Sequence, residues 1–552
     1  MSRFTGISDK SGSTLEAAKD SLSKQQSPSQ GRWALFVVFA LVAALALCLL
    51  PRQSLWIDEI FSLALATGHS LEHPAAAADK TKGDFIEPAS PMPAAEWQQY
   101  LKHEAPPASP GRAVRAVLLS DTSPPLYYLL LYLWTLIWGT SDFALRSLSV
   151  LCSLACFPFV VSVARRTGGP KSVAPACILF PLAPLLFYYS TEGRMYSLLL
   201  LTLLATASAA LRLQEEGGSL SRSIMWIGSS AAGLLTHYFF FFPWAGIVIF
   251  LLLLPGKLSR REILLFLLPI GLIILPWYVA AFECQAHLRS SGAWFNMHRS
   301  PEYDLVGAAR DQVLQSFSGD GYGLWKSETN WSRVSLLLFG CVFLVAFVRR
   351  HRQLFEGPRL LLWLWFIGAA LAPTALDFVD GTYLSHHPRY AVGAAPPAYF
   401  LASFCLTSVG KVRSALMALI VCSWIPSILN IWRQDARIGE PYPKLIRAMA
   451  LTGAKNEAVI VDSIPSGVLG FARYANSATE ITSWIEPLGT RKIPDSLITF
   501  SHGYRRVLLV NIHGFHPSMP EETWLRKHFE TANKRGIAGF EIVDFRSKAE
   551  TF

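Results

Sequence analysis

The sequence predicts an all-α polytopic membrane protein with about eleven transmembrane helices, followed by a small C-terminal α/β domain outside the membrane. Composition is the first reason: of 552 residues, 52% are hydrophobic and 16% are charged, whereas soluble domains carry about a quarter charged residues. The second reason is that apolar residues gather in runs of membrane length. The first of these, residues 33–50, contains no Asp, Glu, Lys or Arg.

The N-terminal part divides into a tail, a span and a long loop. Residues 1–32 are rich in Ser, Lys and Gln, which is typical of a disordered tail. The run at 33–50 has no small-residue cleavage site after it, so we interpret it as a retained span rather than a signal peptide. The first outer loop, 51–142, contains an apolar, aromatic stretch at 124–138. This stretch is too short to cross, and we expect an interfacial helix.

Basic residues predict which side of the membrane each loop occupies. They form short clusters between apolar runs, as at Arg165-Arg166, Arg260-Arg261 and Arg349-Arg350. If 124–138 does not cross, all these clusters fall on the cytoplasmic side, with the N-terminus inside and the C-terminus outside. The net charge of +10 then reflects cytoplasmic loops, and nucleic acid is not an expected partner. The spans after the first are expected near 143–164, 172–189, 195–213, 223–236, 238–254, 262–281, 333–348, 360–376, 391–409 and 414–432.

The composition changes after the last predicted span. Residues 458–462, 506–510 and 540–544 are short apolar runs rich in β-branched residues, which indicates strands. They alternate with polar or helical stretches. We therefore divide the chain into a cytoplasmic tail at 1–32, a transmembrane domain at 33–432 and an extracytoplasmic α/β domain at 433–552.

With this topology, a group of charged and aromatic residues falls on the outer side of the membrane. Two adjacent carboxylates follow the first span directly, and the others lie at the outer ends of later spans. Ionised groups at membrane depth are candidates for function. The group consists of Asp58, Glu59, Asp121, Arg146, Glu192, Arg194, Tyr196, His237, Arg389 and Tyr390.

These residue types restrict the chemistry of such a cavity. A guanidinium group binds two oxygens of a lipid phosphate and stays charged when dry, and a carboxylate can take a proton from an incoming hydroxyl or amine. Together they indicate sugar transfer from a polyprenyl-phosphate donor, in one displacement that inverts the anomeric centre. Simpler readings remain open: Arg146 snorkelling to head groups, Glu192 capping a helix, His237 as an interfacial residue, and Asp58 binding a divalent cation.

The motifs resemble those of the GT-C superfamily, in the group of protein O-mannosyltransferases (glycosyltransferase family 39) and lipid A aminoarabinose transferases. The resemblance covers roughly residues 33–432. Its matching segments occur in family order and are Trp56-Ile-Asp58-Glu59, Asp121-Thr-Ser-Pro-Pro-Leu-Tyr-Tyr, Phe143-Ala-Leu-Arg146, Tyr189-Ser-Thr-Glu192-Gly-Arg194-Met-Tyr196, His237-Tyr238 and Pro388-Arg389-Tyr390 with Pro396.

The resemblance implies roles for these residues. Asp58 would be the catalytic base with Glu59 as its neighbour, and Arg146 would contact the donor phosphate. Glu192, Arg194 and Tyr196 would line the site, and Arg389 would lie near the point where the lipid phosphate enters. The family often has His before the Pro pair, where this chain has Ser123, which puts an acceptor or metal role at that position in doubt.

The resemblance also implies a donor, an acceptor and a location. The expected partners are a polyprenyl-phosphate-linked sugar, membrane lipid and an acceptor that is a lipid, a glycan or a protein. The expected location is a bacterial inner membrane, and no cofactor is implied with certainty. The alternative from another class is a secondary transporter or flippase. That alternative predicts mid-span charges and two similar halves with broken helices, neither of which the sequence shows.

Overall fold

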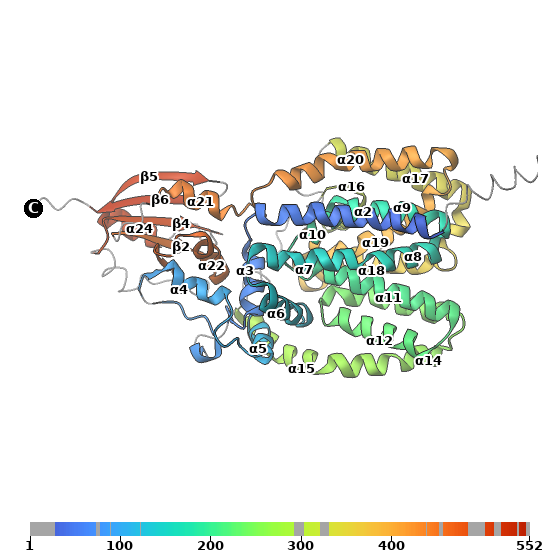
Figure 1. Ribbon diagram of the computed structural model, residues 1–552, viewed down its shortest axis with the longest axis horizontal. Coiled ribbons are helices and arrows are strands. Elements are labelled where there is room, and N and C mark those ends of the chain that lie inside the picture. Colours follow the sequence, from blue (N-terminus) through green and yellow to red (C-terminus); the bar gives the residue numbers. More distant parts are fainter. Residues whose placement is uncertain are drawn as a thin grey trace, which may run out of the picture.

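The computed structural model describes residues 28–72, 78–88, 90–121, 123–291, 303–320, 330–437, 439–451, 456–483, 503–512, 520–537 and 540–547. A long bundle of helices carries a β-sheet at one end (Figure 1). The predicted fold class, helical and polytopic with a small α/β region near the C-terminus, is confirmed. Residues 1–27 of the predicted tail at 1–32 lie outside the described residues. The first helix of the bundle, α2, spans Pro28–Leu49 and so begins within the predicted tail.

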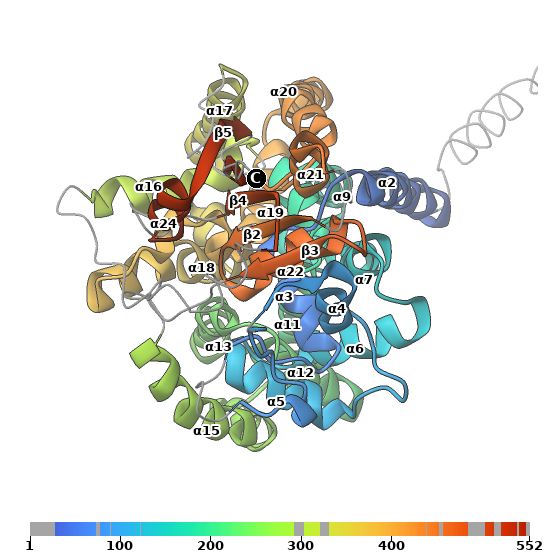
Figure 2. The same cartoon turned by 90° about the vertical axis from the view of Figure 1, so that its left-hand side faces the viewer.

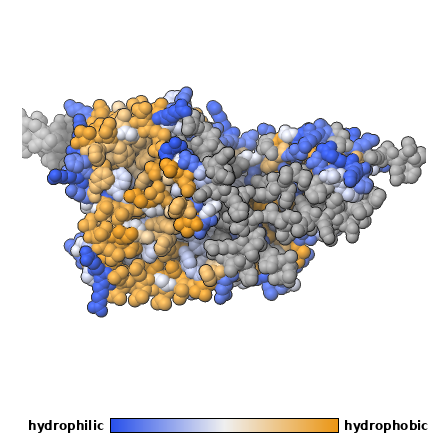
Figure 3. All heavy atoms as spheres, turned by 180° about the vertical axis from the view of Figure 1, so that it is seen from behind, coloured by the Kyte–Doolittle hydropathy of each residue, from blue (hydrophilic) through white to orange (hydrophobic). Residues whose placement is uncertain are grey.

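Seven helical segments in the described part of the chain are long and apolar enough to cross a membrane. Their outer surface is largely hydrophobic, as Figure 3 shows for one face of the bundle. The chain is therefore a multi-pass membrane protein. The seven segments are Trp33–Arg52, Asp142–Gly168, Tyr196–Glu216, Arg260–Cys284, Asn330–Phe355, Arg359–Asp380 and Gly410–Arg433.

Several of these segments contain breaks. Asp142–Gly168 consists of α7 (Asp142–Ala155) and α8 (Phe157–Gly168), and Arg260–Cys284 contains α14 (Arg260–Leu265) and most of α15 (Leu267–Ser291). The other spanning helices are α2, α11 (Tyr196–Glu216), α17 (Asn330–Phe355), α18 (Arg359–Asp380) and α20 (Arg413–Arg433).

The predicted count of about eleven spans is not confirmed, because some predicted spans form shorter helices. By length and composition, the described residues provide an eighth crossing if α9 (Pro170–Leu182) and α10 (Pro184–Ser190), which meet at 57°, count as one span. Pro184 lacks an N–H for the helix ladder, which explains the break. The short helices α12 (Leu220–Leu234), α13 (Phe241–Leu253) and α19 (Ala395–Leu406) occupy three other predicted spans.

The first outer loop packs across the end of the bundle that faces the sheet. Its apolar stretch forms α6 (Leu126–Trp138), which lies at this end and has only 13 residues, as expected for a helix that does not cross (Figure 1). The same end holds α3 (Ile57–Ala66), α4 (Ala94–Gln98) and α5 (Pro110–Ser120). The helix α16 (Leu305–Ser318) packs against α18 within the bundle.

The sheet has the strand order β1-β3-β2-β4-β6-β5. Its centre, β3 (Glu480–Ser483), β2 (Glu457–Asp462) and β4 (Arg506–Asn511), is parallel, and β6 (Phe540–Ser547) and β5 (Phe529–Ile537) extend it antiparallel. The edge strand β1 (Met92–Pro93) comes from the first outer loop and pairs antiparallel with β3. Two regions that sequence analysis treated separately thus share one sheet.

Helices connect this sheet to the bundle. The helix α22 (Pro465–Tyr474) packs against β2 and also against α3 and α4, so it lies between the sheet and the first outer loop (Figures 1 and 2). The helix α21 (Tyr442–Met449) follows the last span, and α24 (Pro520–His528) packs on β5 and β6.

Candidate active site

The acidic pair stands in the first turn of α3, directly after the first span. Carboxylates are favoured there because the N-terminal end of a helix carries partial positive charge. Successive helical residues point about 100° apart, so the two side chains face different surroundings. The Asp58 side chain is 25% exposed, whereas that of Glu59 is fully buried. The two neighbours therefore lie in different environments.

The buried member, Glu59, pairs with Arg146. Its two oxygens accept hydrogen bonds from Arg146 Nε at 2.7 Å and Nη2 at 2.5 Å. Oε1 also accepts the backbone N–H of Gly193 at 2.7 Å. A Cβ at position 193 would lie 2.6 Å from Leu145 Cγ, so this close approach requires glycine.

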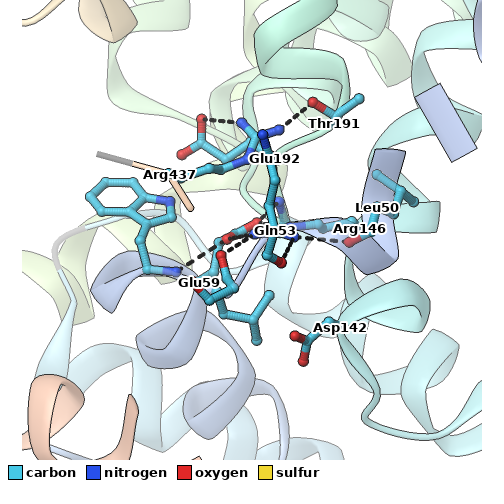
Figure 4. A network of polar contacts seen from close by, with 12 residues as sticks. Leu50, Gln53, Glu59, Asp142, Arg146, Thr191, Glu192 and Arg437 are labelled. Carbon is cyan, nitrogen blue, oxygen red and sulfur yellow. Dashed lines mark hydrogen bonds and ion pairs between the residues drawn. The ribbon is translucent and has the colours of Figure 1, made fainter. Parts of the chain in front are cut away.

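Arg146 does not have the position that we predicted for it. Besides its two bonds to Glu59, it donates to three backbone carbonyls that follow α2, those of Leu50, Gln53 and Ser54 (Figure 4). A guanidinium group has five N–H donors, and these five bonds use all of them. Arg146 is also completely buried. In this structure Arg146, which we expected to contact the donor phosphate, and Glu59, which we expected to act as the neighbour of the catalytic base, form a fully buried pair.

The exposed member, Asp58, faces two arginines from distant parts of the chain. Its Oδ2 lies 2.9 Å from Arg389 Nη1 and 3.9 Å from Arg194 Nη2. Arg194 Nη1 donates to Ser62 Oγ at 2.8 Å and to Tyr128 Oη at 3.1 Å. Asp58 and two cations thus share one partly open site at the end of the bundle.

Each of these arginines keeps an unused donor. Within the described residues, Nε of Arg194 and Nε of Arg389 have no hydrogen-bond partner, although both atoms are buried. A buried N–H without an acceptor costs free energy. The two guanidinium groups thus carry N–H donors that no described residue uses.

Asp121 closes another side of the same site. Its Oδ2 lies 3.8 Å from Arg194 Nη1 and accepts a hydrogen bond from the Tyr128 hydroxyl. Its Oδ1 accepts the backbone N–H of Ser123 at 3.0 Å. Ser123, at the position where the family often has His, therefore contacts Asp121 through its backbone N–H.

Aromatic rings form a wall next to the arginines. The ring of His237 lies 5.9 Å from that of Tyr196 and 6.3 Å from that of Tyr390, between centroids. The Arg389 guanidinium lies 5.2 Å from the centre of the Tyr390 ring and 5.8 Å from that of Trp56, which is a cation–π arrangement. The structure thus brings together Asp58, Asp121, Arg194, Tyr196, His237, Arg389 and Tyr390 from the predicted group.

His237 is held neutral. Its Nδ1 accepts the backbone N–H of Phe239 at 3.1 Å, which places the ring proton on Nε2. Burial lowers the pKa of His237 to about 3, and the charge of Arg194 acts in the same direction. The neutral ring offers an Nε2–H donor.

This pKa predicts how stability depends on pH. Between pH 6.5 and about 3 the unfolded chain protonates His237 and the folded chain does not, so folding stability falls as the pH is lowered through this window. His237→Asn keeps an acceptor for the Phe239 N–H and removes the titrating group. Thermal unfolding in detergent at pH 7.5 and 4.5 should show a larger loss of Tm on acidification for the wild type than for the variant. Equal losses would contradict a buried, neutral His237.

Glu192 lies beside this site but pairs with a residue that sequence analysis missed. Its Oε2 lies 3.9 Å from Arg437 Nη1, and both side chains are only 1% exposed (Figure 4). Within the described residues neither carboxylate oxygen of Glu192 accepts a hydrogen bond, and burial raises its pKa to about 7. The expected lining role of Glu192 is therefore replaced by a buried pair. No motif marks Arg437, which lies between the last span and the sheet.

In the part of the chain that the structure describes, no group of three or more His, Cys, Asp or Glu side chains is arranged to hold a metal ion. The Asp58 oxygen that we considered as a cation ligand is instead 2.9 Å from Arg389. This oxygen is therefore paired with a cationic side chain in the structure.

Comparisons with known proteins bear on the fold of the chain. The family profile of dolichyl-phosphate-mannose-protein mannosyltransferases matches residues 122–279. The crystal structure of ArnT from Cupriavidus metallidurans in the apo state superposes with a TM-score of 0.57 at 12% identity, over 94% of this chain and 98% of ArnT. The chain has the GT-C fold. The resemblance inferred from the motifs is confirmed.

A second structure gives the same result for the GT-C fold. ArnT from the same organism bound to undecaprenyl phosphate gives a TM-score of 0.54 at 12% identity, over 93% of this chain and 98% of that one. The archaeal oligosaccharyltransferase AglB from Archaeoglobus fulgidus, in complex with an inhibitory peptide and a dolichol-phosphate, gives a TM-score of 0.48 at 12% identity, with coverages of 87% and 69%. No curated protein sequence matches the chain. The family profile and the two ArnT structures lend no support to the transporter or flippase that we considered.

Proposed function

We propose that the chain is an inverting glycosyltransferase that moves a sugar from a polyprenyl-phosphate donor to an acceptor at the outer face of the membrane. The observation that carries this proposal is the juxtaposition of Asp58 with Arg194 and Arg389, two cations whose buried Nε–H groups have no partner among the described residues. The match to the mannosyltransferase profile and the GT-C fold support it.

The two arginines hold the phosphate of the donor. A phosphate carries several acceptor oxygens, and its negative charge makes the hydrogen bonds from these donors stronger than those to a neutral acceptor. As the bond to the sugar breaks, negative charge grows on the departing phosphate, and the arginines stabilise it. The rings of Tyr196, His237 and Tyr390 form the adjoining wall, where His237 Nε2–H donates to a sugar or phosphate oxygen.

Asp58 is the general base for the acceptor. An acceptor hydroxyl or amine attacks the anomeric carbon, and a new bond forms there while the bond from that carbon to the phosphate oxygen breaks. The polyprenyl phosphate leaves with the electron pair, and the proton of the acceptor passes to the Asp58 carboxylate. One such displacement inverts the anomeric configuration.

The site lies on the extracytoplasmic side, together with the sheet. The helix α8, which ends with Arg165 and Arg166, reaches the end of the bundle opposite the sheet (Figure 1). Basic loops stay in the cytoplasm, which supports a cytoplasmic N-terminus and a location in a bacterial inner membrane. The transferred group is a hexosyl or pentosyl unit, and the acceptor is a lipid, a glycan or a protein.

A donor panel tests this proposal. Purified protein in detergent with lipid is incubated with radiolabelled polyprenyl-phosphate sugars, and release of polyprenyl phosphate or labelled product is measured. Turnover of at least one donor is expected. Absence of both turnover and donor binding across hexosyl and pentosyl donors would contradict the proposed function.

Arg389→Lys tests the phosphate contact. Lysine keeps the positive charge for Asp58 but loses the planar fork and the Nε–H. We expect donor affinity to fall by about 10–100-fold, the equivalent of one charge-assisted hydrogen bond, with a smaller change in KM for the acceptor. Arg526→Lys, in the partly exposed pair with Glu522 on α24, is the matched control and should bind donor normally. Unchanged donor affinity in Arg389→Lys would remove this residue from the phosphate site.

A further inference from the structure

The segment before Asp58 is held by a part of the chain from far along the sequence. Residues 434–441 connect α20 to α21, and we call them the connector; residue 438 lies outside the described residues. The connector runs beside residues 53–57, with a parallel bridge between Ser54 and Ala436. The connector and residues 53–57 are more than 370 residues apart in sequence. Next to them, Gln53 Nε2 donates to the carbonyl of Ile431 at the end of α20.

Backbone N–H groups before Asp58 are largely satisfied by the C-terminal region. Ser54 N–H donates to the carbonyl of Asp435 at 3.1 Å, and Leu55 N–H donates to Tyr474 Oη at 2.7 Å. Ile57 N–H donates to Glu440 Oε2 at 2.9 Å. A segment with buried backbone donors is fixed in place by whatever accepts them. The position of Asp58 therefore depends on residues beyond the last span.

Glu440 is the central acceptor in this contact. Its side chain is nearly fully buried, and Oε2 also accepts the hydroxyl of Tyr442 at 3.1 Å, while its carbonyl accepts Ser54 Oγ at 2.7 Å. A turn with Gly439 at φ +77° brings Glu440 back toward the bundle, with Glu440 N–H bonded to the Arg437 carbonyl at 3.0 Å. The carboxylate meets the first turn of α3, where negative charge is favoured.

Tyr474 is a second residue that fixes the same segment by hydrogen bonding. Its hydroxyl accepts Leu55 N–H and donates to Asp142 Oδ2 at 2.5 Å, at the start of α7. Arg473 bonds the other oxygen of Asp142 at 2.6 Å. The end of α22 thus joins the loop before Asp58 to the helix that carries Arg146.

We propose that Glu440 and Tyr474 are positioning residues for Asp58, so that the connector and α22 form part of the catalytic apparatus. This inference rests on the proposed function for its effect on turnover. Neither residue touches the open site in the described contacts. They act by fixing the start of α3, because small displacements of a catalytic group have large effects on rate.

The test compares Glu440→Ala with Glu440→Gln in the full-length protein. Glutamine keeps an acceptor oxygen for Ile57 N–H, whereas alanine removes it. We expect alanine to lower kcat by about 10²-fold, with little change in KM for the donor, and glutamine to regain most of that loss. Glu541→Ala, at the partly exposed pair with Lys534 on the sheet, is the control and should behave as wild type.

A readout independent of turnover separates this inference from the proposed function. Hydrogen exchange of peptides covering residues 53–57 should be faster in Glu440→Ala and in Tyr474→Phe than in wild type, with exchange in the transmembrane helices unchanged. Exchange at 53–57 equal to wild type in both variants would overturn the positioning role, as would equal kcat losses for alanine and glutamine. Faster exchange in the two variants, together with a wild-type protein that neither turns over nor binds any donor, would instead overturn the proposed function and leave the positioning of 53–57 supported.

Discussion

Asp58→Asn is expected to lower kcat for sugar transfer by about 10²–10⁴-fold, the range of a lost general base. The amide has the shape of the carboxylate, and its oxygen can still accept a hydrogen bond from Arg389, so the fold of the site is kept. It cannot take a proton from the acceptor. The measurement is single-turnover transfer with the donor that the wild type uses, together with donor affinity.

Measuring donor affinity distinguishes the loss of a general base from a structural effect of Asp58→Asn. The change removes a negative charge from beside Arg389 and Arg194, so phosphate binding should be kept or strengthened. Asp380→Asn, at the exposed end of α18, is the matched control and should leave transfer unchanged. If Asp58→Asn transferred sugar at the wild-type rate, the base would have to be sought elsewhere. A loss of donor binding in proportion to kcat would indicate a structural role.

The positions that sequence analysis predicted well are those where a local signal marks a boundary. A charge-free apolar run at 33–50 predicts that Asp58 follows the first span, and α3 does follow the segment Trp33–Arg52. The basic clusters indicated that 124–138 does not cross, and α6 is indeed a short helix at the end of the bundle. Such signals depend on composition over a few residues and need no tertiary contact.

The roles within the site were less predictable, because they depend on contacts between distant residues. Asp58 and Glu59 are adjacent carboxylates with the same chemistry, and only packing decides which one is buried. Arg146 has the sequence context of a phosphate ligand, yet all its donors are used inside the protein. Glu440 lies 383 residues from its partner Ile57, and no local pattern marks it. Helix lengths were overestimated where prolines interrupt apolar runs, as at Pro184.

Arg146→Met is expected to reduce stability rather than donor affinity. The change leaves Glu59 as a buried charge without its cation and leaves three backbone carbonyls without their donor. Breaking a buried ion pair from one side costs about 3–5 kcal/mol. The variant should show a lower thermal unfolding midpoint in detergent and poorer expression, while donor affinity of the folded fraction stays near that of wild type.

The double variant Glu59→Gln with Arg146→Met shows whether the cost comes from the uncompensated charge. Glutamine removes the charge and keeps an acceptor for Gly193 N–H, so the double variant should be more stable than Arg146→Met alone. A stable Arg146→Met protein that no longer binds the donor would restore the phosphate role to Arg146. The expected result instead assigns the two neighbours in the first turn of α3 to separate tasks: Glu59 anchors the helix through Arg146, and that anchor allows Asp58 to meet the acceptor in a fixed position.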